Sequence, residues 1–173
     1  MTAAQPAPGH PRLDEGQGEW RDGVTRYLML RDDSLMGMFR RLSPSARRDA
    51  LAALAASVAE AGGRSAARYR EADAAADGLL MERIGEVAAR LGWGIWRFER
   101  PGPDELRLEV ANSPFATGFG SSAEPVCAPI LGMLETVAAM VMGRPAVAQE
   151  TVCAAAGGGC CRFIARVQTP LNP

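Results

Sequence analysis

Residues 127–161 decide the fold, and they read CAPILGMLETVAAMVMGRPAVAQETVCAAAGGGCC. Almost every side chain over residues 128–142 is apolar, and Glu135 carries the only charge. This pattern predicts a helix that is buried or lies at a subunit contact. The segment is shorter than the roughly 20 residues that a membrane-crossing helix needs, so we expect no membrane span. Residues 146–153 and 161–168 surround a glycine-rich turn and predict an antiparallel β-hairpin.

All four cysteines of the chain belong to this region. Cys127 stands just before the apolar helix, while Cys153 and Cys161 close the two sides of the hairpin. Strand pairing brings the latter two together, and docking of the helix start against the sheet adds the third thiol. Glu150 is the nearest carboxylate for a fourth ligand. Because strict strand alternation puts Glu150 and Cys153 on opposite faces, the arrangement requires a β-bulge or the end of the strand near this point.

Spacing alone leaves two interpretations of these cysteines open. Three thiolates and a carboxylate suit Zn²⁺ better than Mg²⁺ or Ca²⁺, and a structural zinc site takes four protein ligands. The positive end of a helix dipole also favours the deprotonated form of Cys127. Against this, buried cysteines often serve as small apolar side chains, and no CxxC pair is present. Cys160 receives no role, because adjacent cysteines rarely both bind one tetrahedral ion.

The preceding chain begins with a leader and then predicts mostly helices. Residues 1–20 are rich in Pro, Gly and small polar side chains and predict a disordered leader. They contain no apolar run long enough for a secretory signal, so we expect a cytoplasmic protein with reduced thiols. A strand is expected over Val24–Leu30. Three helices follow, with predicted starts near Leu35, Ser43-Pro44 and Asp77. The second of them contains Gly62-Gly63, which either ends the helix or lets another backbone pack closely.

A further β-hairpin precedes the cysteine-rich region. Residues 93–100 and 106–112 flank the turn-forming residues 101–104, and their alternating apolar side chains predict one buried face. A loop rich in Gly, Ser and Pro is expected over residues 113–125. The length of the chain suits one hydrophobic core, so residues 21–170 predict a single domain.

Composition excludes several classes of function. The chain has 19 Lys and Arg against 20 Asp and Glu, without the basic surplus of a nucleic-acid-binding protein. The one histidine, His10, lies in the leader, so we expect no histidine base in the folded part. No G-x-G-x-x-G loop follows a predicted strand, and a zinc ion with four protein ligands has no open position for Lewis-acid chemistry. We therefore assign no catalytic residue.

Four short segments resemble the 4-vinyl reductase domain family. They are residues 112–115 (Asn-Ser-Pro-Phe), 125–127 (Pro-Val-Cys) with Gly132 five residues on, 150–153 (Glu-Thr-Val-Cys) and 161–163 (Cys-Arg-Phe). The family includes proteins linked to bacteriochlorophyll synthesis, stand-alone archaeal proteins and the aromatic-sensing domains of phenol- and xylene-responsive transcription activators. In those sensors three Cys and one Glu hold a zinc ion. By position, the resemblance implies the zinc ligands Cys127, Glu150, Cys153 and Cys161.

The resemblance also implies a fold and a pocket. The expected fold is α+β, with helices packed on one side of an antiparallel sheet and a zinc site that joins a helix start to the C-terminal hairpin. Such domains usually form dimers and enclose a small hydrophobic ligand. The candidate wall residues of that pocket are Trp96, Phe98, Leu108, Val110, Phe115 and Phe119. Each of them, taken singly, also fits an ordinary core position.

These expectations favour a zinc-stabilised binding protein for a small hydrophobic ligand, either a tetrapyrrole pigment precursor or an aromatic compound. It would act as a carrier, an accessory factor or a sensor, as a homodimer, with a pigment-synthesis enzyme or a signalling protein as partner. The alternative is a reductase, or a reductase subunit, that acts on a tetrapyrrole vinyl group in bacteriochlorophyll synthesis. A simple phenol fits less well than a larger or more apolar ligand, because the expected folded part lacks the histidine that the sensors place against the phenolic hydroxyl.

Overall fold

The computed structural model describes residues 9–73 and 77–168. The strands are β1 (Arg12–Asp14), β2 (Glu19–Asp22), β3 (Thr25–Tyr27), β4 (Ile95–Gly102), β5 (Glu105–Ala111), β6 (Ala146–Val152) and β7 (Cys161–Val167). The helices are α1 (Asp32–Arg40), α2 (Pro44–Asp73), α3 (Asp77–Arg90), α4 (Pro114–Phe119) and α5 (Ala128–Met142), with a 3-10 turn η1 (Ala154–Ala156).

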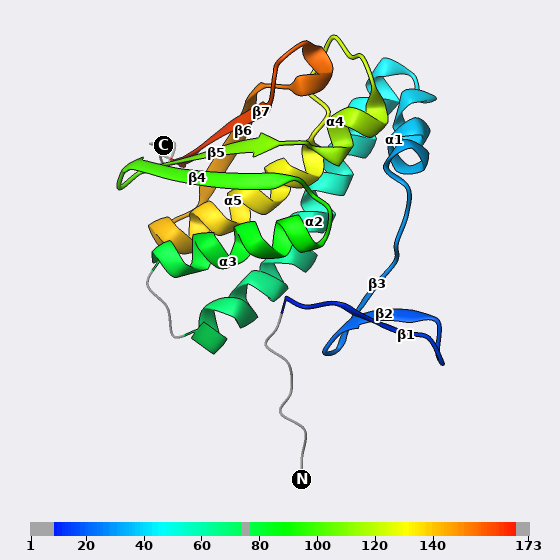
Figure 1. The fold of residues 1–173 in the computed structure, drawn as a ribbon. Helices are drawn as coiled ribbons and strands as arrows, with labels where there is room; N and C mark the ends of the chain where they lie inside the picture. Colours follow the sequence, from blue (N-terminus) through cyan, green and yellow to red (C-terminus); the bar gives the residue numbers. More distant parts are fainter. Residues whose placement is uncertain (1–8, 74–76, 169–173) are drawn as a thin grey trace.

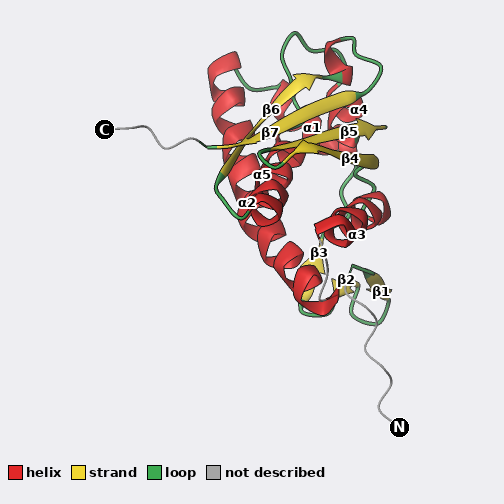
Figure 2. Ribbon diagram, turned by 90° about the vertical axis from the view of Figure 1, so that its left-hand side faces the viewer, coloured by secondary structure: helices red, strands yellow, loops and turns green. Residues whose placement is uncertain are grey.

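The main layer is a four-stranded antiparallel sheet with the strand order β4-β5-β7-β6. Helix α5 packs against β5, β6 and β7, and α3 packs against the edge strand β4, so both helices cover the same face (Figure 2). The long helix α2 crosses α5 and contacts it rather than the sheet (Figure 1). The expected α+β fold, with helices on one side of an antiparallel sheet, is confirmed. Within the described ranges, no helix combines the length and the apolarity needed to cross a bilayer.

The two faces of the sheet differ in chemistry as strand alternation requires. Leu106, Leu108 and Val110 of β5 point into the core and are at most 1% exposed. On the other face, Glu109 lies opposite Arg97 of β4 and Arg162 of β7 and forms ion pairs with them at 3.9 and 3.0 Å. Exposed pairs of this kind add little stability, but they mark the outer face as the one in contact with water.

Glycines allow α2 and α5 to approach closely. A Cβ on Gly132 of α5 would lie 2.1 Å from the Ala55 carbonyl oxygen of α2. On the other helix, a Cβ on Gly62 would lie 2.7 Å from Met133 Sδ, and one on Gly63 would lie 3.0 Å from the Thr136 methyl carbon. Helix α2 runs through both glycines without a break. Of the two alternatives for Gly62-Gly63, close packing is therefore the one found.

The structure places strands in part of the segment that the sequence predicts to be disordered. Strands β1, β2 and β3 form a three-stranded antiparallel meander, with Leu13 opposite Trp20 and Trp20 opposite Tyr27. Strand pairing and the contact between these apolar side chains compensate for strands of only three or four residues. Residues 1–8 of the expected leader lie outside the described residues. Strand β3 ends at Tyr27, so Leu28–Leu30 connect it to α1 instead of extending it.

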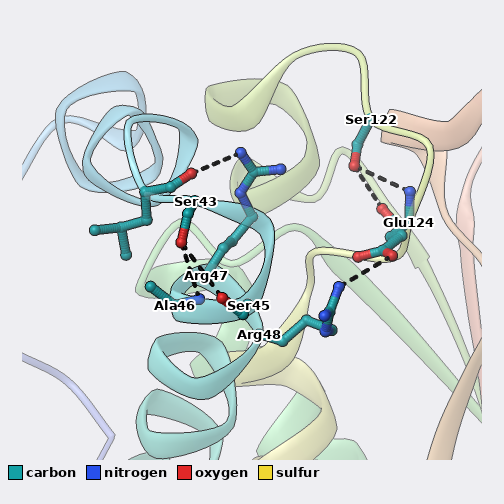
Figure 3. A network of polar contacts seen from close by, with 8 residues as sticks. Ser43, Ser45, Ala46, Arg47, Arg48, Ser122 and Glu124 are labelled. Carbon is teal, nitrogen blue, oxygen red and sulfur yellow. Dashed lines mark hydrogen bonds and ion pairs between the residues drawn. The ribbon is translucent and has the colours of Figure 1, made fainter.

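A serine followed by proline begins two helices. Ser43 Oγ accepts a hydrogen bond from Ala46 N at 3.4 Å at the start of α2 (Figure 3), as predicted. Ser113 Oγ accepts one from Ala116 N at 3.4 Å and begins α4, in a region that the sequence predicts to be a loop. At the same end of α2, Arg48 forms an ion pair with Glu124 at 3.6 Å, which connects α2 to the segment before Cys127 (Figure 3).

Replacing Gly132 by Ala should lower the free energy of unfolding by about 1–3 kcal/mol or more, because the added methyl group overlaps the Ala55 carbonyl. Urea denaturation followed by circular dichroism measures the change. As a control, Gly102→Ala adds the same group where no other atom lies within 4 Å, and its effect should stay below about 0.5 kcal/mol. Equal stability of the two variants would contradict the close contact between α2 and α5.

Candidate functional site

Three cysteines and one glutamate from distant parts of the chain meet at one end of the sheet. Cys127 is the N-cap residue of α5, Glu150 lies in β6, Cys153 follows β6, and Cys161 begins β7. One potential ligand atom from each residue lies within 4.8 Å of the others. The three cysteines are at most 3% exposed. We refer to these four residues as the thiol–carboxylate cluster.

A β-bulge in β6 lets Glu150 and Cys153 face the same point. Glu150 pairs with Phe163 and Val152 pairs with Arg162, so the register of β6 against β7 shifts between them. The extra residue, Thr151, changes the alternation of the strand, and the strand ends at Val152. Glu150 and Cys153, which strict alternation would separate, can then face the same point. The sequence predicted a β-bulge or a strand end near this point if the two residues share a site, and the structure contains both.

The distances between the sulfur atoms fit a common metal ion. Cys127 Sγ lies 4.0 Å from Cys153 Sγ and 3.6 Å from Cys161 Sγ. Two sulfurs bound to one tetrahedral Zn²⁺ at 2.3 Å lie about 3.8 Å apart, whereas a disulfide bond is about 2.05 Å long. All three cysteines are free thiols.

The carboxylate of Glu150 has one satisfied oxygen and one unsatisfied oxygen. The backbone N–H of Cys127 donates a hydrogen bond to Glu150 Oε2 at 3.0 Å, whereas Oε1 is buried without a partner among the described residues. Burial raises the pKa of Glu150 to about 8, and the neighbouring Cys153 thiol adds to this effect. A buried carboxylate oxygen without a partner is costly, and a bound cation would satisfy it.

The sulfurs share protons unequally. Hydrogen bonds from Cys127 and Cys161 lower the pKa of Cys153. The pKa of Cys127 is raised instead, by its hydrogen bonds with Cys153 and Cys161 and by burial. The first proton to leave therefore leaves Cys153. A divalent cation at the centre would favour loss of the remaining protons, because metal ligands bind as thiolates. The donor set and its burial thus fit a metal ion.

Neighbouring groups orient the sulfurs. Ser113 Oγ lies 3.3 Å from Cys127 Sγ, and the backbone N–H of Ala154 in η1 donates to Cys161 Sγ at 3.3 Å. Ser113 is 2% exposed and also caps α4. This serine lies in one of the four family-like segments, but the sequence predicted no role for it. Its signature, serine before proline, is the one that marks the start of α2. Cys160 is not part of the cluster.

A separate apolar cavity of about 290 Å³ lies between α2, α3, α5 and β3. Apolar side chains from these elements and from the α3–β4 connection form most of its wall, among them Val58, Ile84, Val87, Leu91, Trp93 and Met133. Tyr27 and Tyr69 also line it, and burial raises the pKa of both phenols. A phenol is neutral near pH 7 already at its ordinary pKa of about 10, so both hydroxyls carry a proton.

Strand β3 is attached to the helical wall of this cavity by hydrogen bonds. Arg68 Nη2 of α2 donates to Thr25 Oγ1 at 2.8 Å and to Ser65 Oγ at 3.0 Å. Thr25 and Ser65 both line the cavity. The meander is therefore part of the cavity wall, although the sequence predicts most of this segment to be a leader.

The six predicted wall residues are distributed over different places. Trp96 lines the cavity, whereas Phe98 lies in a shallow groove between α3 and β4. Leu108, Val110, Phe115 and Phe119 are core residues, at most 5% exposed, that do not line it. Tyr27 and Tyr69 were not predicted from the sequence. No periodic pattern marks them, because the cavity forms only when β3 meets α2 and α3.

Known proteins share both the sequence of the cluster region and the fold. Residues 106–167 match the family model of the 4-vinyl reductase domain. No curated protein sequence matches the chain. Among solved structures, the phenol-responsive sensory domain of the transcription activator PoxR, solved with phenol, gives a TM-score of 0.78 at 16% identity, over 91% of this chain and 84% of that one.

Two further solved structures share the fold. A vinyl-4-reductase family protein from Methanocaldococcus jannaschii gives a TM-score of 0.50 at 14% identity, over 81% of this chain and 96% of that one. A trafficking protein particle complex subunit 3 from Naegleria fowleri, covalently bound to palmitic acid, gives 0.54 at 13% identity, over 82% and 98%. The segment matched by the family model runs from β5, without its first residue, through β7 and contains the whole thiol–carboxylate cluster, so residues 106–167 are similar to the 4-vinyl reductase domain.

Proposed function

We propose that this chain is a zinc-stabilised binding protein for a small hydrophobic ligand and acts as a sensor or a carrier. The observation that carries the proposal is the apolar cavity with two neutral tyrosines in its wall. Specific ligand pockets combine a mostly apolar wall with a few polar groups that orient the ligand. The PoxR sensory domain, which shares the fold, responds to phenol, and the subunit from Naegleria fowleri holds palmitic acid.

The size of the cavity supports an aromatic compound over a tetrapyrrole pigment precursor. A volume of about 290 Å³ lies at the lower end of the roughly 300–1,000 Å³ of drug-sized ligand pockets. One aromatic ring with a short side chain fits this space, whereas a macrocycle of four pyrroles is larger. The wall of aliphatic and indole groups also favours a ligand whose part inside the cavity is more apolar than phenol.

Zinc is the metal that we propose for the thiol–carboxylate cluster. Three thiolates favour a borderline-soft ion, and four protein ligands close a tetrahedral site. The ion would join the start of α5 to the β6–β7 hairpin. Because Met133 of α5 lines the cavity, the same ion would also fix the position of one cavity wall.

We further propose that the chain forms a homodimer through the segment after β3. Leu28, Met29 and Leu30 are 86, 71 and 54% exposed, and nearby Val24 is 84% exposed. Consecutive exposed apolar side chains of this size mark an interaction surface. Since Tyr27 lines the cavity and Leu28 follows it directly, ligand binding and dimer contact would involve one continuous stretch of backbone.

The purified protein should contain about one zinc ion per chain by elemental analysis. Cys153→Ser should lose the metal and unfold without cooperativity, because formation of the site and folding are coupled. Cys160→Ser is the matched control and should keep both properties, since this thiol lies outside the cluster. A well-folded, metal-free wild-type protein would refute the assignment.

At about 100 times its dissociation constant, 3-phenylpropanol should raise the melting temperature by roughly 5–10 °C, without consumption of NAD(P)H. Val58→Trp places a large ring in the cavity and should remove the shift, while Val147→Trp on the exposed side of β6 should keep it. An equal shift in both variants would argue against the cavity as the binding site. Steady cofactor oxidation that depends on this protein alone would favour the reductase.

Light scattering after gel filtration should give the mass of a dimer for the wild-type protein. The double substitution Leu28→Asp and Met29→Asp should give a monomer, because two carboxylates cannot be buried unpaired in an apolar contact. Val147→Asp, at another exposed apolar position, should remain dimeric. A monomeric wild-type protein, or a dimeric double variant, would be inconsistent with this surface.

A further inference from the structure

A second compartment, of about 470 Å³, adjoins the apolar cavity. Tyr27, Leu91 and Trp93 line both spaces and therefore stand between them. The rest of the second compartment comes from the meander and the residues just before it, from the end of α3, and from Leu28 and Met29 in the segment after β3. The apolar cavity and the second compartment are therefore neighbours that share the part of their wall formed by Tyr27, Leu91 and Trp93.

The chemistry of this compartment differs from that of the cavity. Its wall contains three aromatic and three basic side chains, namely Trp20, Tyr27, Trp93, His10, Arg12 and Arg90. No carboxylate of the described residues lines it. An aromatic wall with a one-sided positive charge suits an apolar molecule that carries an anionic group.

Neither arginine is strongly neutralised by the protein. Arg90 pairs with Glu86 at 3.3 Å, but the two side chains are 37 and 54% exposed, and such pairs contribute only about 0–1 kcal/mol. Arg12 lies directly opposite Arg21 across β1 and β2, and like charges in this position repel. Arg21 itself pairs with Glu19. The attraction of an anion to Arg12 and Arg90 would therefore outweigh the loss of the weak ion pair between Arg90 and Glu86.

A buried contact holds the segment of His10 and Arg12 against the helices. The backbone N–H of Gly9 donates to Asp22 Oδ2 at 2.7 Å. Gly9 is buried, and a Cβ there would lie 2.5 Å from the Val87 side chain. Val87 also lines the apolar cavity. The basic wall of the second compartment is thus anchored to the wall of the first.

We infer that the ligand is an aromatic carboxylate whose ring occupies the apolar cavity and whose carboxylate lies in the second compartment, facing Arg12 and Arg90. This inference rests on the proposed binding function and specifies its ligand class. A carboxylate forms charge-assisted hydrogen bonds with guanidinium groups, which are stronger than those of a neutral hydroxyl. The two spaces together thereby select for both the ring and the charge.

The test compares 3-phenylpropionate with 3-phenylpropanol, which share the ring and the carbon chain. Tryptophan fluorescence can follow binding, because Trp20, Trp93 and Trp96 all line one or both spaces. At pH 7 and low salt, the wild-type protein should bind the carboxylate about tenfold or more tightly than the alcohol. The double variant R12Q/R90Q should bind the two equally, with its affinity for the alcohol unchanged. Arg48→Gln, on a distant ion pair, should keep the preference.

The outcomes separate this inference from the proposed function. If the wild-type protein binds both compounds equally, or if R12Q/R90Q keeps the preference, the inference is wrong while the binding function stands. If neither these compounds nor propylbenzene bind, both the proposed function and the inference fail. Higher ionic strength should weaken binding of the carboxylate and leave binding of the alcohol unchanged, since salt screens exposed charges.

Discussion

The meeting of three thiols and one carboxylate at the start of α5 is the constraint on which the rest of the structure depends. The cluster fixes the N-terminal end of α5 against the β6–β7 hairpin, and the close contact of Gly132 with Ala55 fixes its middle against α2. Met133, the next residue along α5, lines the apolar cavity. A local arrangement of four polar groups thus sets the position of a helix, and that helix forms part of the wall of the apolar cavity.

Elements with a strong hydrophobic pattern, and sites built from a scarce residue type such as cysteine, could be predicted from the sequence. The apolar run over residues 128–142 coincides with α5, and both predicted hairpins of the main sheet are present. Strands β1 and β2 were missed because strands of three or four residues are too short to show alternation, whereas β3 lies within the strand predicted over Val24–Leu30. Helix α4 was missed although Ser113-Pro114 repeats the cap of α2, because the glycines and serines around it dominate the composition.

The two parts of the candidate site differ in how far the sequence predicts them. The residues of the cluster stand out because cysteines are few and lie at the ends of well-predicted elements. The cavity has no such mark, since its wall joins single side chains of β3, α2, α3 and α5 that meet only in the folded protein. Trp96 could be proposed as a wall residue because its strand was predicted from the sequence. His10 was assigned to a leader, yet it lies beside the second compartment.

The bulge in β6 has a consequence for recognising distant relatives. In an unbroken strand, two side chains that face one point must be separated by an even number of positions. Glu150 and Cys153 are separated by three, an odd interval that the bulge at Thr151 and the end of the strand at Val152 reconcile with a shared ligand point. A glutamate three positions before a cysteine, at the end of a strand, is therefore a sequence fingerprint of this hairpin that can persist where overall similarity has been lost.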